Sequence, residues 1–296
     1  MTKETILKRP ALTGIILASL LLIICFVLSV TVSDASEETA ITDPNSRTVP
    51  IIMYHSILPD PERAGEYVLP PSSLESDMLW LKEHGYRTVT AAQLADFCEG
   101  SGELPEKPVI LSFDDGQLNN LTYVLPLLQK HDMCASFSIV GRYCEAACEE
   151  AEPSDLYSYM DISDLITLTQ SGRAELLNHS YDMHELGERR GALQKSTESF
   201  EEYRRIFFND TFAAQRIIKE NCGFAPVCYS YPYGFSCAAS RALVKICGFK
   251  CSFGVEEKLN TVTKGDKNSL YDLGRFNRPA GKSSDLFFSE VFGQNY

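Results

Sequence analysis

Residues 109–116 of the chain read VILSFDDG, an apolar run that ends in two adjacent carboxylates and a glycine. The apolar run predicts a strand that is buried on both faces, as in a parallel sheet covered by helices. An Asp-Gly pair is also typical of a hairpin turn, but the following residues 118–131, LNNLTYVLPLLQKH, place leucines at three- and four-residue spacing. That spacing is the period of an amphipathic helix. The segment therefore predicts a strand, an acidic loop and a helix, with Asp114 and Asp115 at the end of the strand.

The same alternation of strands and helices continues along the chain. Capping-box patterns at Ser72 with Glu75 and at Thr90 with Gln93 predict two helix starts, and a long helical pattern from about 198 to 220 closes at Gly223. Such alternation implies an α/β fold with a parallel sheet, here a distorted (β/α) barrel of about seven to eight strands. In such a barrel the active groups gather at the C-terminal ends of the strands. Besides 109–113, strands are expected at 49–54, 86–89, 135–140, 174–178, 227–231, 249–253 and 271–276.

The N-terminus has the pattern of a membrane anchor. Residues 1–10 carry three basic side chains, and residues 11–32, ALTGIILASLLLIICFVLSVTV, contain no charge. This run is long enough to cross a bilayer and longer than the apolar core of a cleaved signal peptide. We therefore expect a single-pass signal-anchor at 11–32, a cytoplasmic segment at 1–10, a flexible linker at 33–48 and an extracellular domain at 49–296. Secretion after cleavage near Ala35 is the alternative.

Charge and cysteine content narrow the classes of partner and site. With 27 basic and 40 acidic residues the net charge is −13, which repels phosphate backbones and argues against a nucleic-acid partner. Of the 10 cysteines, Cys25 falls in the apolar run, and the spacing of the others does not match a zinc knuckle. The spacing leaves the disulfide state open.

Three of the five histidines follow predicted strands: His55, His179 and His184. The last two lie five residues apart in NHSYDMH, which on a helix would separate them by about 140° around the axis. A loop is therefore needed to bring them together. Beside Asp115 they would supply two imidazoles and a carboxylate for a divalent metal, with positions left open for water and substrate. Two loop histidines with structural hydrogen bonds are the alternative.

Three motifs in this order resemble those of a known family. SFDDG at 112–116, NHSYDMH at 178–184 and YSYPYG at 229–234 look like the first motifs of the polysaccharide deacetylases, the NodB-like group called carbohydrate esterase family 4. The five-residue histidine interval and MYHS at 53–56 are similar to the branch that acts on poly-N-acetylglucosamine. The resemblance covers the chain from about residue 50 onward and implies a barrel of the NodB-homology type.

The resemblance also implies roles for individual residues. It assigns Asp115, His179 and His184 to a divalent metal, with Zn²⁺ expected first and Co²⁺ or Ni²⁺ as alternatives. It assigns Asp114 as the general base, and the backbone N–H of Tyr233 as a donor to the oxyanion. The metal would lower the pKa of a bound water towards about 7, so that the resulting hydroxide could attack an acetamide carbonyl.

Two positions depart from the family pattern. Ser230 stands where most of the group has an arginine that orients the base, and Arg275 or Arg278 could replace that arginine. Most of the group also has a late histidine as general acid, but here none follows His184. Because the first and last strands of a barrel are neighbours, we predict that His55 supplies this acid.

The site residues together with this resemblance predict a metal-dependent hydrolase that removes N-acetyl groups from N-acetylglucosamine units of an extracellular or cell-wall polysaccharide. An O-acetyl esterase of the xylan type is one alternative. A catalytically impaired surface glycan-binding protein is another, suggested by the missing arginine and late histidine. Trp80, the only tryptophan, is expected in the core. Candidates for stacking on a sugar ring are Tyr54, Tyr181, Tyr231, Tyr233 and Phe235.

Overall fold

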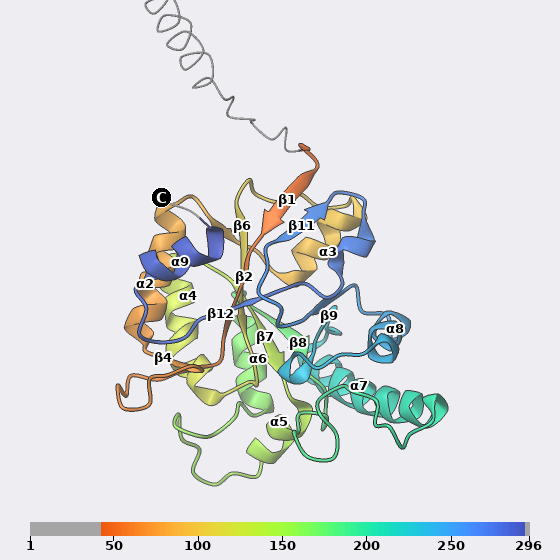
Figure 1. Ribbon diagram of the computed structural model, residues 1–296. Helices are drawn as coiled ribbons and strands as arrows, with labels where there is room; N and C mark the ends of the chain where they lie inside the picture. Colours follow the sequence, from red (N-terminus) through yellow and green to blue (C-terminus); the bar gives the residue numbers. More distant parts are fainter. Residues whose placement is uncertain (1–42, 294–296) are drawn as a thin grey trace, which may run out of the picture. The chain divides into compact units, whose positions relative to one another are not determined.

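A parallel sheet of eight strands forms the centre of the compact unit that spans Asn45–Tyr296 (Figure 1). The structure is a computed structural model that describes residues 43–293. The short strand β5 (Arg87–Thr88) pairs with the first residues of β6. The other seven strands follow one another across the sheet in the order β10 (Cys251–Phe253), β9 (Cys228–Ser230), β8 (Ala174–Asn178), β7 (Ala135–Ile139), β6 (Pro108–Phe113), β2 (Ile51–Tyr54) and β12 (Phe276–Asn277).

The sheet curls so far that the segment containing one edge strand, β12, also contacts the opposite edge strand, β10. Phe276 of β12 pairs in parallel with Ile52 of β2, and Leu273, just before β12, forms a single bridge with Phe253 of β10. The predicted distorted barrel of seven to eight strands is therefore confirmed. The strand expected at 271–276 is shorter than predicted, because only Phe276–Asn277 joins a ladder.

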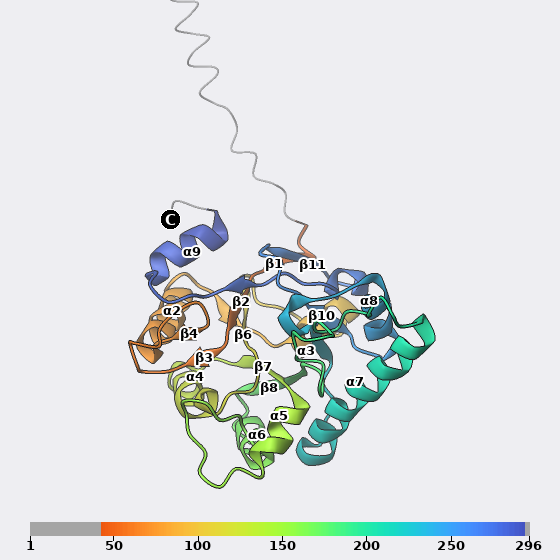
Figure 2. The ribbon, with the colours of Figure 1, turned by 60° about the horizontal axis from the view of Figure 1, so that its bottom comes forward.

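Eight α-helices are described, and helices cover the outside of the sheet (Figure 2). All six residues of β6 are buried, as expected for a parallel strand covered on both faces. The helices are α2 (Pro71–Glu83), α3 (Ala91–Glu99), α4 (Leu125–His131), α5 (Gly141–Ala147), α6 (Ile162–Gln170), α7 (Phe200–Cys222), α8 (Ala238–Ile246) and α9 (Ser284–Phe292). Trp80 of α2 is buried in the main core, as predicted.

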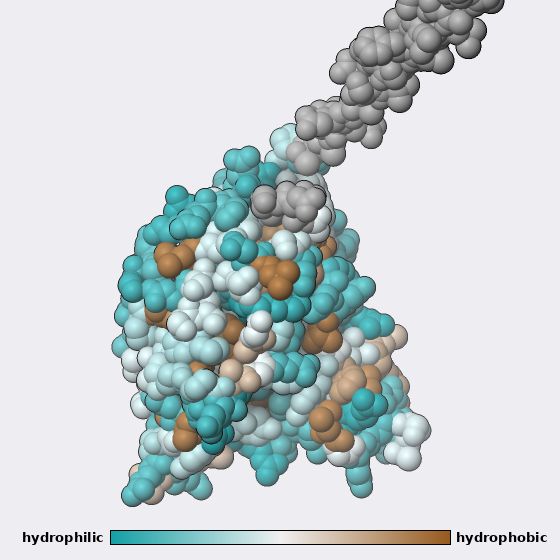
Figure 3. Space-filling view, turned by 60° about the vertical axis from the view of Figure 1, so that its left-hand side comes forward, coloured by the Kyte–Doolittle hydropathy of each residue, from teal (hydrophilic) through white to brown (hydrophobic). Residues whose placement is uncertain are grey.

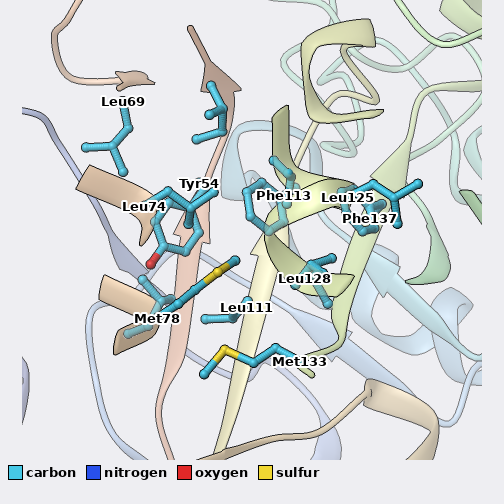
Figure 4. Packing of buried hydrophobic residues seen from close by; sticks show 14 of the residues in the cluster. Tyr54, Leu69, Leu74, Met78, Leu111, Phe113, Leu125, Leu128, Met133 and Phe137 are labelled. Carbon is cyan, nitrogen blue, oxygen red and sulfur yellow. The ribbon is translucent and has the colours of Figure 1, made fainter. Parts of the chain in front are cut away.

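A row of aromatic rings sets the register of the strands beneath the site. Tyr54, Phe113 and Phe137 lie opposite one another on β2, β6 and β7, with ring centroids 5.0 and 5.1 Å apart (Figure 4). Their packing against α2 and α4 buries these rings almost completely. His55 and Asp114 directly follow Tyr54 and Phe113, so this packing fixes the positions at which His55 and Asp114 leave the ends of β2 and β6.

Two of the helix ends predicted from the sequence are confirmed, and one is wrong. Thr90 with Gln93 forms a capping box at α3, and α7 ends at Gly223 in the left-handed conformation. The capping box expected at Ser72 is wrong, because α2 already begins at Pro71 and Pro70 occupies the N-cap. Proline at the first helical position has no N–H that needs a cap.

The helix predicted after VILSFDDG is wider than an α-helix over its first turn. Residues Asn120–Val124 form a π-helical turn, η1, before α4 begins. Pro126 has no N–H for the carbonyl four residues earlier, and the Leu125 N–H instead donates to the Asn120 carbonyl.

The remaining short elements lie at the margins of the sheet. They are β1 (Ser46–Val49) paired antiparallel with β11 (Asn260–Thr263), β3 (Ser56–Ile57) paired with β4 (Val68–Leu69), and the 3₁₀ turns η2 (Pro232–Gly234) and η3 (Lys267–Leu270). Because β1 begins at Ser46, the last residues of the predicted linker belong to the folded unit, which starts earlier than expected.

The predicted anchor at 11–32 and the linker up to residue 42 lie outside the described residues. Among residues 43–293, no helix combines the length and apolar character needed to span a bilayer. The cysteines in this range are free thiols, with Cys228 and Cys251 buried as small apolar side chains. On the face that carries α2 and α9, hydrophilic side chains predominate and hydrophobic ones form separate spots (Figure 3).

Candidate metal centre and active site

Asp115, His179 and His184 come together at the C-terminal ends of β6 and β8. Asp115 Oδ1 lies 3.1 Å from His184 Nε2 and 3.6 Å from His179 Nε2. One ligand atom from each residue fits within a 4.8 Å span. Asp115 has a φ of 71°, in the left-handed region that Asp tolerates better than most residues. The loop after His179 brings in His184, as the five-residue interval required.

Both histidines are held through the nitrogen that faces away from Asp115. His179 Nδ1 lies 2.8 Å from the carbonyl oxygen of Ser230. Because a carbonyl only accepts hydrogen bonds, Nδ1 carries the proton and the Nε2 lone pair of the neutral ring is free to bind a metal. His184 Nδ1 lies 3.3 Å from the hydroxyl of Tyr143, a residue of α5 that sequence reasoning missed.

The electrostatics of the group favour a cation. Burial opposes protonation of His179, but Asp114 and Asp115 outweigh it and raise the pKa of the imidazole. Burial would raise the pKa of Asp115, but hydrogen bonds and positive charge from the two histidines hold it far below its ordinary value. Two imidazoles and a carboxylate around one point are a donor set used for catalytic divalent metals. The residues present therefore fit such an ion.

Asp114 pairs with an arginine, whereas its neighbour Asp115 faces the two histidines. Arg275 Nη1 donates to Asp114 Oδ1 at 2.8 Å and to Ser112 Oγ at 3.0 Å, and Arg275 Nε donates to the Gly254 carbonyl at 2.8 Å. Burial would raise the pKa of Asp114, but the Arg275 guanidinium and the charge of His179 outweigh it and lower the pKa to about 2.

Of the two arginines considered from the sequence, only Arg275 reaches Asp114. Arg278 instead forms a buried ion pair with Asp77, at 2.9 Å from Nε to Oδ2. Tyr54 donates to the same Oδ2 atom at 3.2 Å. Arg278 therefore ties the segment directly after β12 to α2.

His55 lines the same cavity from the end of β2. The cavity of about 670 Å³ is also lined by Asp114, Asp115, His179 and His184. The His55 ring packs edge-on against Tyr67, with centroids 4.8 Å apart. Burial lowers the pKa of His55, while the nearby aspartates oppose the change. The barrel thus brings the first strand to the site, as expected from its nearly closed sheet.

Tyr233 lies in a turn held open by a glycine. It has a φ of 55°, and its ring centroid lies 4.3 Å from that of His184. Gly234 has a φ of 69°, and a Cβ there would lie 2.1 Å from Val255 Cγ2. The turn therefore requires glycine at this position.

The candidate sugar-stacking residues divide into three groups. Tyr54 and Tyr231 are buried at 1% exposure, so they cannot present a ring to a sugar. Tyr181 directs its hydroxyl to Glu145 and does not line the cavity. Tyr233 and Phe235 do line it, and Tyr67, which sequence reasoning missed, joins them with 52% exposure.

Comparisons with known proteins agree with this site. Residues 101–252 match the family model described as "Polysaccharide deacetylase". The poly-β-1,6-N-acetyl-D-glucosamine N-deacetylase of Staphylococcus aureus (strain MRSA252) is 25% identical over 202 residues, which cover 68% of this chain and 65% of that protein. The enzyme of the same name from Escherichia coli (strain K12) is 30% identical over 118 residues, 38% of this chain and 18% of that protein. The match therefore spans less than two thirds of either relative.

Solved structures share the fold. A de-N-acetylase from Aggregatibacter actinomycetemcomitans has a TM-score of 0.69 at 22% identity, covering 82% of this chain and 99% of that one. IcaB from Ammonifex degensii has a TM-score of 0.66 at 22% identity, covering 83% and 96%. The family match spans half of the chain and contains Asp114, Asp115, His179, His184 and Tyr233, although His55 and Arg275 lie outside it. With its fold and its matched residues in agreement, the chain belongs to the polysaccharide deacetylase family.

Proposed function

We propose that this protein is a divalent-metal-dependent N-deacetylase that acts on N-acetylglucosamine units of an extracellular polysaccharide. The observation that carries the proposal is the meeting of two kinds of group in one cavity. Asp115, His179 and His184 can hold an ion, and Asp114 lies beside them as an arginine-paired carboxylate. Two contacts speak against the alternative of an impaired glycan-binding protein: Arg275 pairs with Asp114, and His55 lines the same cavity.

A divalent ion held by these three residues would supply Lewis acidity, which would lower the pKa of a water and polarise a carbonyl. Asp114 accepts the proton of the attacking water. The ion pair with Arg275 keeps this carboxylate ionised and fixes its direction. The carboxylate is therefore held in the form that can accept a proton.

The acetyl carbon gains a C–O bond to the water oxygen, and its C–N bond to the sugar breaks. The Tyr233 main-chain N–H donates to the oxyanion formed on the way. His55 gives a proton to the departing nitrogen, so that the products are acetate and a free amine. Burial lowers the pKa of His55, so its ring gives up a proton more readily than an exposed histidine does.

The choice of substrate rests on the two named relatives, which are poly-β-1,6-N-acetyl-D-glucosamine N-deacetylases. The cavity supports it, since the exposed rings of Tyr67 and Tyr233 can stack on pyranose faces. Zn²⁺ is the proposed ion, because imidazole and carboxylate ligands suit it. We further propose that residues 11–32 anchor the chain in the cell membrane with the enzyme outside, where such a polymer lies.

Acetate release separates these proposals. The metal-free protein, reloaded with Zn²⁺, is incubated with β-1,6-linked N-acetylglucosamine oligomers and, in parallel, with acetylated xylan. We expect acetate from the oligomers, and none after chelation or in Asp115→Ala. Release from xylan alone would replace the proposal by the O-acetyl esterase. Glycan binding without acetate from either substrate would favour the impaired protein.

A further inference from the structure

A carboxylate outside the cavity contacts the loop between the two metal-binding histidines. Asp210, in the middle of α7, accepts hydrogen bonds from the main-chain N–H groups of Tyr181 at 2.9 Å and Asp182 at 2.7 Å. It does not line the cavity. Burial raises the pKa of Asp210 to about 6, although these two N–H groups oppose the change. Hydrogen bonds from N–H groups to a carboxylate are about twice as strong as those between neutral groups.

The same loop is held from its other side by α5. The N–H groups of Gly141 and Arg142, at the start of that helix, donate to the carbonyls of Ser180 at 3.0 Å and Tyr181 at 2.9 Å. The main chain of Tyr181 is therefore bonded through both its N–H and its C=O. Gly141 leaves the room for this contact, because a Cβ there would lie 2.8 Å from the Tyr181 ring.

The first residues of the loop are tied to α7 as well. Asn178, the last residue of β8, donates from Nδ2 to the carbonyl of Thr211 at 3.0 Å and accepts the Ser180 N–H at 2.9 Å. Ser180 has a φ of 72°, a left-handed conformation that is costly for serine unless its surroundings hold it. Asp210 and Thr211, which are consecutive residues of α7, thus bind the two ends of the turn at 178–182.

These contacts answer a geometric requirement of the five-residue histidine interval. On a helix, His179 and His184 could not face one ion, so the loop must be irregular. Irregular backbone has no ladder to satisfy its N–H groups, and the groups buried against the protein need other acceptors. Asp210 provides the acceptor for two successive N–H groups in the middle of this interval.

We propose that Asp210 is a positioning residue of the metal centre, which sets the distance between His179 and His184 by fixing the loop that joins them. Residues that orient metal ligands typically change metal affinity by about 10- to 100-fold when they are removed. The inference rests on the proposed metal site but not on the substrate or on turnover.

The test compares Asp210→Asn with a matched variant, Glu175→Gln. Glu175 also accepts two successive main-chain N–H groups, those of Ala91 and Ala92, both at 2.8 Å. Burial raises its pKa as well. It lies near the start of β8, whereas His179 and His184 follow the end of that strand. Each substitution places an NH₂ group against a main-chain N–H and is expected to lower stability.

The Zn²⁺ dissociation constant is measured by competition with a chromogenic chelator, and stability by urea unfolding of the metal-free proteins. We expect Asp210→Asn to weaken Zn²⁺ binding by about 10- to 100-fold and Glu175→Gln to change it by less than about twofold. Wild-type affinity in Asp210→Asn, or an equal loss in both variants, would overturn the inference.

Amide hydrogen exchange in the wild-type protein tests the same contacts if Asp210→Asn does not fold. We expect slow exchange at Tyr181 and Asp182, and exchange as fast as in an unfolded chain would contradict the role of Asp210. A wild-type protein that binds Zn²⁺ but releases no acetate would overturn the proposed function and leave this inference standing. A wild-type protein that binds no metal would overturn both.

Discussion

Replacing Arg275 by methionine tests the support of Asp114. The side chains of the pair are exposed by only 1% and 4%, and Arg275 makes further hydrogen bonds to Ser112 and Gly254. Removing one partner of such a buried pair leaves an uncompensated charge and costs about 3–5 kcal/mol. A solvent-exposed pair such as Arg142 with Asp182 contributes only about 0–1 kcal/mol. The burial of the pair therefore decides the expected magnitude.

The ion pair also sets a pH dependence of stability. The pKa of Asp114 is about 2, below the 3.8 of an ordinary aspartate, so its contribution is fully present above about pH 4 and is lost as the pH falls towards 2. In Arg275→Met this contribution becomes smaller, because burial raises the pKa of the carboxyl and only the nearby histidines still oppose it. Urea unfolding of the metal-free protein between pH 3 and 7 measures the difference.

Two further variants make the result interpretable. The double variant Arg275→Met with Asp114→Asn removes both charges and should be more stable than Arg275→Met alone. Arg278→Met breaks the buried pair with Asp77 and should cost a similar free energy of unfolding. Unlike Arg275→Met, it should keep acetate release at temperatures where it is folded. A cost below about 1 kcal/mol for Arg275→Met, or no recovery in the double variant, would refute the reasoning.

Three other predictions concern the turn, an outer contact and the acid. Gly234→Ala should lower kcat at least about tenfold, because the new Cβ would clash with Val255. Gly248→Ala is the control, since Gly248 also has a positive φ but open space where a Cβ would lie. It should lose only about 1 kcal/mol of stability and no activity. Tyr143→Phe should weaken Zn²⁺ binding about tenfold, because it removes the hydroxyl beside His184, and unchanged affinity would exclude that role. If His55 is the acid, kcat/KM should fall as the pH rises through a pKa below about 6.5, and His55→Gln should lose that limb. A profile that is flat there would remove His55 from the mechanism.

Much of the fold and the central residues could be predicted from local patterns. The carboxyl ends of parallel strands meet at one edge, so the strand pattern allowed Asp115 and His179 to lie together, and the family resemblance assigned both to a metal. His55 followed from the closure of the barrel. Arg275 and Arg278 could not be separated, because they lie three residues apart after the same irregular segment. Only the tertiary structure shows that one faces Asp114 and the other Asp77.

The residues that were missed are those whose partners are distant in sequence. Tyr143 lies 41 residues from His184, and Asp210 lies 28 residues from Asp182, with no motif linking them. Local rules also failed where proline changed them. Pro70 and Pro71 displaced the cap expected at Ser72. The contacts of Tyr143 and Asp210 depend on packing between elements, which sequence spacing does not encode.

The central claim is that Asp115, His179 and His184 bind one divalent ion on which acetate release depends. The most direct measurement is a Zn²⁺ titration of the metal-free wild-type protein, with bound metal and acetate release from N-acetylglucosamine oligomers followed in the same samples. We expect both to rise together and to saturate at one equivalent, with neither restored in Asp115→Ala. Full acetate release before any metal is bound would contradict the claim.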